Sequence, residues 1–142
     1  MAAREAALNL SVPLNAYLLV ALGSGLGGAA RLWVSTIVAR GAGTVFPWGT
    51  LAVNVFGCLL VGILGAMFEP SSPLHVRQDL RVLLVVGLLG GFTTFSAFSL
   101  ETLLLLQRGA PLAAATYVVL SIALCLLAAA GGYMAMSTAL SS

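Results

Sequence analysis

Four long apolar stretches dominate the chain and constrain its fold more than any other feature. They cover about residues 14–38, 48–68, 80–107 and 112–136. A helix needs roughly 20 apolar residues to cross the hydrocarbon core of a bilayer, and each stretch reaches that length. Because no water satisfies backbone groups inside lipid, such segments fold as helices. We predict an all-α integral membrane protein with four transmembrane helices, forming a single domain over residues 1–142.

Charged residues are too scarce for a soluble domain. They make up 7% of the chain, against 61% hydrophobic residues, whereas soluble domains carry about 25% charged residues. The net charge of +2 comes without a basic cluster, so nothing indicates nucleic-acid binding. No Ser–His or paired-carboxylate arrangement would support hydrolysis, and we therefore expect no enzyme.

The third apolar stretch contains polar and flexible residues near its middle. Gly90 and Gly91 weaken a helix there, because glycine costs about 1 kcal/mol relative to alanine in a helix interior. The hydroxyls of Thr93, Thr94 and Ser96 can bond to the backbone and offer it alternatives to helix. Membrane proteins use broken helices to expose backbone groups to an ion at mid-depth. We therefore predict that the third helix is broken at its middle.

A set of side chains that could face the interior contains hydrogen-bond donors and aromatic rings but no carboxylate. Hydroxyl and amide groups donate hydrogen bonds, and the edge of a phenylalanine ring is electropositive. Such a set suits a small, hard anion that must lose its water, and it does not suit a cation pathway. The predicted pathway residues are Asn54, Thr94, Phe95, Ser96, Phe98, Tyr117 and Ser121.

Three of these residues also allow a purely structural interpretation. The amide of Asn54 is costly in hydrocarbon unless it is paired, so it either joins two helices or lines a pore. Tyr117 and Ser121 lie four residues apart and share one helix face. They either bond to a neighbour or to their own backbone, or form a polar track facing Asn54.

Small residues predict close helix packing in two places. Gly23 and Gly27 form a small-xxx-small pair, which lets helix backbones approach closely in lipid. The second helix carries small residues at four-residue intervals after Asn54, namely Cys58, Gly62 and Ala66, and these predict a tightly packed helix face.

The two cysteines, Cys58 and Cys125, both lie in apolar stretches and have no metal-ligand spacing. Free cysteine is most often simply buried, so we interpret both as small packing residues.

Two charged residues lie within the apolar stretches. Arg31 either extends its side chain to the membrane interface or attracts anions at a vestibule. Glu101 lies near the end of the third stretch. We expect it to reach the interface or to pair with an arginine.

The arginines are distributed almost evenly between the two sides of the predicted bundle. One side carries Arg4, Arg77 and Arg81, and the other carries Arg40 and Arg108, together with Arg31 if it reaches that side. The positive-inside rule needs an asymmetry to fix orientation. We infer dual insertion, which permits an antiparallel homodimer. Carbonyls freed at the two breaks could then hold one Na⁺ between the subunits.

Three motifs in the chain resemble those of a known family. They are Gly-Gly-Ala-Ala-Arg at 27–31, Pro-Trp-Gly-Thr-Leu-Ala-Val-Asn at 47–54 and Gly-Gly-Phe-Thr-Thr-Phe-Ser-Ala-Phe-Ser at 90–99. In this order they resemble the Fluc (CrcB) fluoride channels, over about residues 14–136. The resemblance implies an antiparallel, dual-topology homodimer in the cell inner membrane that exports F⁻ passively through two pathways.

The resemblance also implies roles for particular residues. Asn54 would be the pore amide, Phe95 and Phe98 the lining ring pair, and the carbonyls of Gly90 and Thr93 the ligands of a structural Na⁺ at the dimer interface. Tyr117 and Ser121 would lie on a polar track, and Arg31 near a vestibule. This chain has Cys125 where the family often has a further hydroxyl, and a thiol is a weaker donor.

Two other functions compete with a fluoride channel. A small dual-topology multidrug/proton antiporter would need a membrane-embedded acid, and Glu101 is the only acid within any apolar stretch. In a non-transporting membrane scaffold, the polar residues would only join helices.

Overall fold

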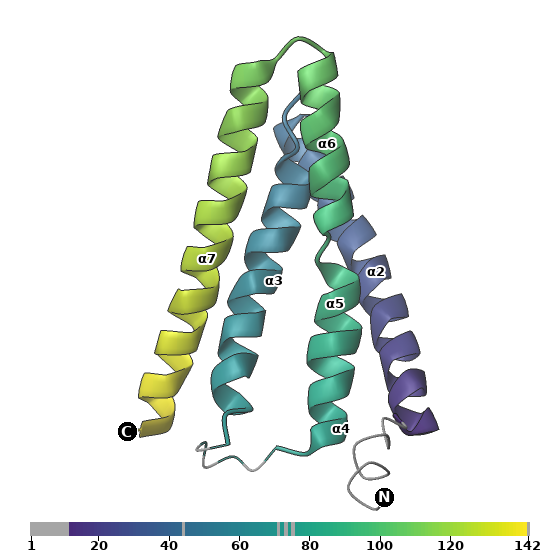
Figure 1. Ribbon diagram of the computed structural model, residues 1–142, viewed down its shortest axis with the longest axis vertical. Coiled ribbons are helices and arrows are strands. Elements are labelled where there is room, and N and C mark those ends of the chain that lie inside the picture. The colour runs from purple at the N-terminus through teal and green to yellow at the C-terminus, as the bar shows by residue number, and fades with distance from the viewer. Residues whose placement is uncertain (1–11, 44, 71, 73, 75, 142) are drawn as a thin grey trace, which may run out of the picture.

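The computed structural model describes residues 12–43, 45–70, 72, 74 and 76–141. These residues form four helical spans and no strand (Figure 1). The first, second and fourth spans are α2 (Leu14–Ala42), α3 (Trp48–Met67) and α7 (Pro111–Ser141). The third span is built from α4 (Gln78–Arg81), η1 (Val82–Leu89), α5 (Gly90–Phe92) and α6 (Phe95–Gln107). All four spans are long and apolar enough to cross a membrane, which confirms the predicted all-α class.

Two helices continue beyond the apolar stretches that predicted them. The first stretch ends at about residue 38 and the last at about 136, whereas α2 reaches Ala42 and α7 reaches Ser141. Hydropathy marks where lipid ends, but a helix ends where its backbone is interrupted. For α2 the interruption is Gly43, whose φ of 82° is accessible mainly to glycine.

The spans alternate in direction, so that the first runs parallel to the third and the second parallel to the fourth (Figure 1). The link between α3 and α4 lies at the same end as the C-terminal end of α7. The α2–α3 and α6–α7 connections lie at the other end. Gly109, with φ of 71°, closes the α6–α7 turn, and Pro111 opens α7 at a position where its missing N–H costs nothing.

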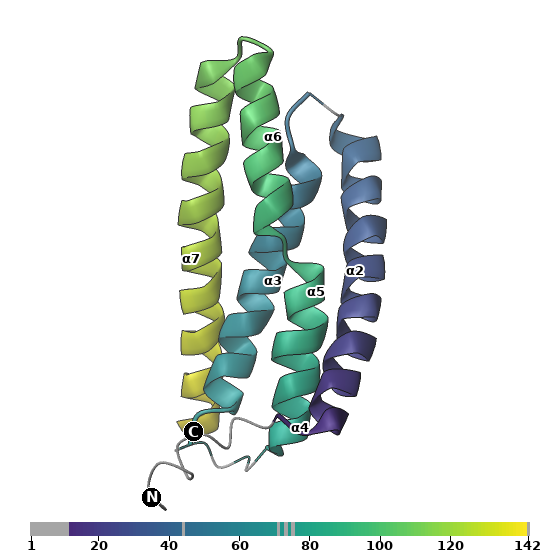
Figure 2. The same ribbon diagram turned by 45° about the vertical axis from the view of Figure 1, so that its right-hand side comes forward.

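The α2 helix packs closely along η1 and α5, as Figure 2 shows. A Cβ atom added at Gly23 would lie 2.8 Å from the carbonyl oxygen of Leu83. One added at Gly27 would overlap the carbonyl oxygen of Leu88. The close helix packing predicted from this glycine pair is confirmed.

The α3 and α7 helices form the second closely packed parallel pair (Figure 2). Gly62 lies against the backbone of Ala129, and Gly132 lies against the carbonyl oxygen of Leu59. The predicted tight face of α3 is therefore confirmed, and its partner is α7. Because the two helices are parallel, successive turns of α3 meet successive turns of α7. We define three levels of this seam, in order: Thr50 with Tyr117, Asn54 with Ser121, and Cys58 with Cys125.

Candidate functional site

Two residues with extended backbone separate α5 from α6. Thr93 has φ −78° and ψ 156°, and Thr94 has φ −151° and ψ 116°. Both hydroxyls bond to nearby backbone: Thr93 Oγ1 donates to the Leu89 carbonyl at 2.9 Å. Thr94 Oγ1 accepts from the Ala97 N–H at 3.2 Å and so caps the start of α6.

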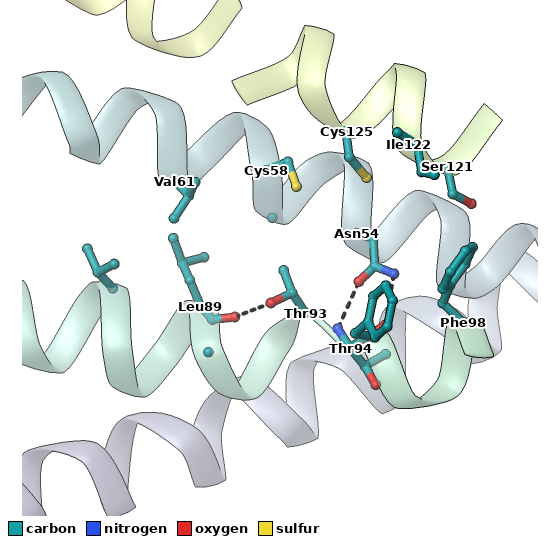
Figure 3. A pocket seen from close by; sticks show the side chains of 14 residues that line it. Asn54, Cys58, Val61, Leu89, Thr93, Thr94, Phe98, Ser121, Ile122 and Cys125 are labelled. Atoms are coloured by element: carbon teal, nitrogen blue, oxygen red, sulfur yellow. Dashed lines mark hydrogen bonds between the residues drawn. The ribbon is translucent and has the colours of Figure 1, made fainter. Parts of the chain in front are cut away.

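The side chain of Asn54 reaches from α3 to this interruption. Its Nδ2 donates to the Thr94 carbonyl oxygen at 3.0 Å, and its Oδ1 accepts from the Thr94 N–H at 2.8 Å (Figure 3). The amide thus supplies both backbone partners that Thr94 lacks outside a helix. This pairing uses one of the two N–H bonds of the amide group.

These contacts divert two N–H groups from their usual helical acceptors. In a continuous α-helix the Thr94 N–H would donate to the Gly90 carbonyl, and the Ala97 N–H to the Thr93 carbonyl. Here the first donates to Asn54 and the second to Thr94 Oγ1. The carbonyls of Gly90 and Thr93 are thereby released from those donors. They are the two carbonyls that the family resemblance implies as Na⁺ ligands.

A cavity of about 370 Å³ lies between α3, the third span and α7. No charged side chain lines it. Its lining includes seven of the residues nominated from the sequence: Asn54, Gly90, Thr93, Thr94, Phe95, Phe98 and Ser121. The hydroxyl of Ser121 is buried, and its Oγ has no hydrogen-bond partner in the described part of the chain.

The two phenylalanine rings of the site contact each other on one face of α6. The centroids of Phe95 and Phe98 are 5.3 Å apart, and the ring of Phe98 also lies 5.3 Å from that of Tyr117. Phe95 is 78% exposed in the single chain. Its ring is therefore available to lipid or to a second subunit.

A second cavity, of about 700 Å³, lies toward the α2–α3 connection. It is lined by Arg31, Trp48, Thr50 and Glu101, among others. Thr94 lines both cavities. The paired Asn54 and Thr94 therefore stand between a cavity lined by both Arg31 and Glu101 and one lined only by uncharged groups.

The structure corrects the prediction for Glu101. Its side chain is half-buried and accepts two hydrogen bonds of 2.7 Å, from the hydroxyls of Thr50 and Tyr117. The salt bridge found within the described residues joins Arg77 to Asp79 instead. A carboxylate inside an apolar bundle requires nearby donors, and hydroxyls on α3 and α7 provide them here.

Two predicted pathway residues lie outside the lining of the smaller cavity. Tyr117 is fully buried, with its hydroxyl on Glu101. Ser96 is exposed, and its hydroxyl lies 3.1 Å from Thr94 Oγ1. Thr50 was not among the predicted residues, although its position one turn before Asn54 places it on the same face of α3.

Comparison with known proteins places the chain in a family. The family model described as "CrcB-like protein, Camphor Resistance (CrcB)" matches residues 18–133. The chain belongs to this family. The relationship predicted from the three motifs is therefore confirmed. Together with the four apolar spans, family membership makes this a multi-pass membrane protein.

Several similar proteins bear the name "Fluoride-specific ion channel FluC". The one from Methylocella silvestris is 46% identical over 112 residues, which covers 79% of this chain and 86% of the relative. The one from Paramagnetospirillum magneticum is 46% identical over 119 residues, covering 84% and 93%. The one from Erythrobacter litoralis is 46% identical over 126 residues, covering 86% and 92%.

Proposed function

We propose that this protein is a fluoride-specific ion channel that lets F⁻ leave the cell passively across the inner membrane. The observation that carries this proposal is the buried hydroxyl of Ser121, which has no hydrogen-bond partner among the residues that the structure describes and lies in the wall of a cavity without a charged group. Asn54 lines the same cavity, and its amide group has one N–H bond that Thr94 does not use. A small anion that sheds its water needs such replacement donors. The names of the relatives support the same function.

The anion would approach through the larger cavity and continue through the smaller one. Arg31 would raise the local anion concentration at the entrance. Thr94, which lines both cavities, would mark the passage between them. Beyond it, the ring edges of Phe95 and Phe98 would meet the anion with their electropositive rims. The hydroxyl of Tyr117 is bonded to Glu101, so its place on this route stays a prediction.

The pathway would be completed in an antiparallel homodimer whose subunits insert in opposite orientations. Arg77 and Arg81 lie at one end of the bundle, and Arg40 and Arg108 lie at the other, which supports dual insertion. Arg4 lies outside the described residues. The exposed ring of Phe95 supports a second subunit against α6.

A structural Na⁺ would lie where the two interruptions meet on the dimer axis. The released carbonyls of Gly90 and Thr93 fit it, because carbonyl oxygen is a suitable ligand for a hard cation. The ion would hold the subunits together by charge and is not part of the anion pathway. Replacing Na⁺ with a bulky organic cation during purification is expected to abolish fluoride flux. Unchanged flux would remove the ion from the proposal.

A multidrug/proton antiporter is not favoured. Such a protein needs a membrane-embedded acid that exchanges protons with a cationic drug. Glu101, the only acid within an apolar stretch, already accepts hydrogen bonds from Thr50 and Tyr117.

The first test is fluoride efflux from liposomes that contain the purified protein, measured with a fluoride electrode. We expect rapid fluoride release, little chloride release from chloride-loaded vesicles, and loss of fluoride release in Phe95→Ile. A well-folded protein that releases no fluoride would contradict the channel. Neutral effects of Phe95→Ala and Asn54→Ala would favour a scaffold in which polar residues only join helices.

A further inference from the structure

The third level of the α3–α7 seam brings together the two cysteines of the chain. Cys58 projects from α3 and Cys125 from α7, and both line the smaller cavity (Figure 3). The two side chains lie one helical turn beyond Asn54 and Ser121, on adjacent walls of that cavity. Both are free and half-buried, so the cavity gives access to them. Their separation in sequence concealed this pairing.

Close backbone packing holds α3 and α7 together next to the two cysteines. One turn beyond Cys58, Gly62 lies against the backbone of Ala129, which is one turn beyond Cys125. A Cβ at Gly62 would overlap the Ala129 carbonyl oxygen. The helices therefore cannot move apart without losing this contact, and the two cysteines stay on adjacent walls of the cavity before any ligand arrives.

We propose that Cys58 and Cys125 form a two-thiolate site for a soft metal cation of the Ag⁺ or Hg²⁺ class. Thiolates select soft metals over hard ones, and two sulfurs from adjacent helices can supply the two ligands that linear coordination of these ions needs. Binding of Hg²⁺ breaks two S–H bonds, forms two S–Hg bonds and releases two protons to the buffer, without an oxidant. The occupied site carries metal into the wall of the cavity beside Asn54 and Ser121.

Only the expected consequence of metal binding, which is block of fluoride flux, rests on the proposed function. The binding itself is independent of transport. The two readouts therefore have to be measured separately, on the reduced full-length protein after removal of the reductant.

Binding is tested with mercuric nitrate, by counting thiols that react with Ellman's reagent after denaturation in detergent. We expect one Hg²⁺ per chain to protect both thiols of the wild type. Release by a competing monothiol should need roughly 10²- to 10⁴-fold more competitor than in Cys58→Ala or Cys125→Ser, because the second thiol acts at a high effective concentration. Equal release from all three proteins would overturn the site. If neither thiol reacts with Ellman's reagent before metal is added, the two cysteines form a disulfide and not the proposed metal site.

Block is tested as fluoride efflux in chloride-free buffer, with each variant compared to its own metal-free flux. We expect one equivalent of Hg²⁺ to stop wild-type efflux and to spare Cys58→Ala/Cys125→Ser. Chelated metal with unaffected flux would overturn the block. Chelated metal in a protein that passes no fluoride even without metal would leave the site standing and refute the proposed channel.

Discussion

The first two levels of the α3–α7 seam are one helical turn apart and differ in how their polar groups are paired. At the first level, Thr50 and Tyr117 both donate to Glu101 at 2.7 Å. At the second level, Asn54 pairs with the backbone of Thr94, while the hydroxyl of Ser121 has no partner among the described residues. The difference comes from the third span, which offers the carboxylate of Glu101 to the first level and the backbone of Thr94 to the second. Satisfied donors hold helices together, and unsatisfied donors facing a cavity are available to an anion.

The largest expected effect on the free energy of unfolding comes from the backbone contact that holds both levels in place. Gly62→Val would push a side chain into the Ala129 carbonyl. Forcing extra volume into close packing costs about 1–3 kcal/mol, and more where backbone blocks the added atoms as it does here. We expect little monodisperse protein after purification in detergent. Gly131→Val is the matched control, because a Cβ there meets no atom within 4 Å. Equal yields of the two variants would show that the levels do not depend on this contact.

Asn54→Ala is expected to give the next largest effect, on both stability and transport. It leaves the N–H and carbonyl of Thr94 without their partners, at about 1–3 kcal/mol for each buried group. The thermal midpoint in detergent should fall, and fluoride efflux from liposomes should be lost. Asn54→Asp keeps the acceptor for the Thr94 N–H but sets a second oxygen against the Thr94 carbonyl oxygen, so its midpoint should also lie below that of the wild type. A normal midpoint for Asn54→Ala would refute the pairing.

Tyr117→Phe separates the first level from the second. It keeps the ring beside Phe98 but removes the donor to Glu101, which costs about 1–3 kcal/mol. We expect a lower thermal midpoint, with a smaller loss of flux per folded protein than in Asn54→Ala. Tyr133→Phe, which loses an exposed 3.3 Å bond to Glu69, is the control and should change little. An unchanged midpoint with lost flux would instead place Tyr117 in the anion pathway.

Ser121→Ala should have the smallest effect on stability and still reduce transport. An unpartnered buried hydroxyl contributes nothing to folding, so the midpoint should stay the same or rise slightly while fluoride efflux falls. Ser137→Ala, at an exposed hydroxyl bonded to its own helix, is the control for both measurements. A destabilisation of more than about 1 kcal/mol would mean that Ser121 has a partner and that the second level is closed like the first.

The fold was predictable from the sequence where a single helix carries the signal. Apolar length gave the four spans, because the bilayer imposes it on each helix separately. The pair Gly23 and Gly27 gave a close contact because its spacing defines one helix face. The π-helical turns of η1 have no comparable signal, since Val82–Leu89 is uniformly apolar apart from Gly87.

The site was predictable only as a set of residues and not as a set of partners. Helical spacing placed Asn54 and Ser121 on inward faces, and both line the cavity. The same spacing could not reveal that Glu101 accepts bonds from two other helices. It also could not show that Tyr117 turns its hydroxyl away from the cavity, because a helix face does not specify where a side-chain oxygen points.

The pairing of Asn54 with Thr94 has a consequence for the depth of the site in the bilayer. One side chain of α3 ties the interruption of the third span to a fixed height on α3. The polar link between α3 and α4 has no part in setting that height. Residues could therefore be added to or removed from this link without raising or lowering the Asn54–Thr94 pair. The length of the link is free to vary, whereas the depth of the pair is fixed by its two hydrogen bonds.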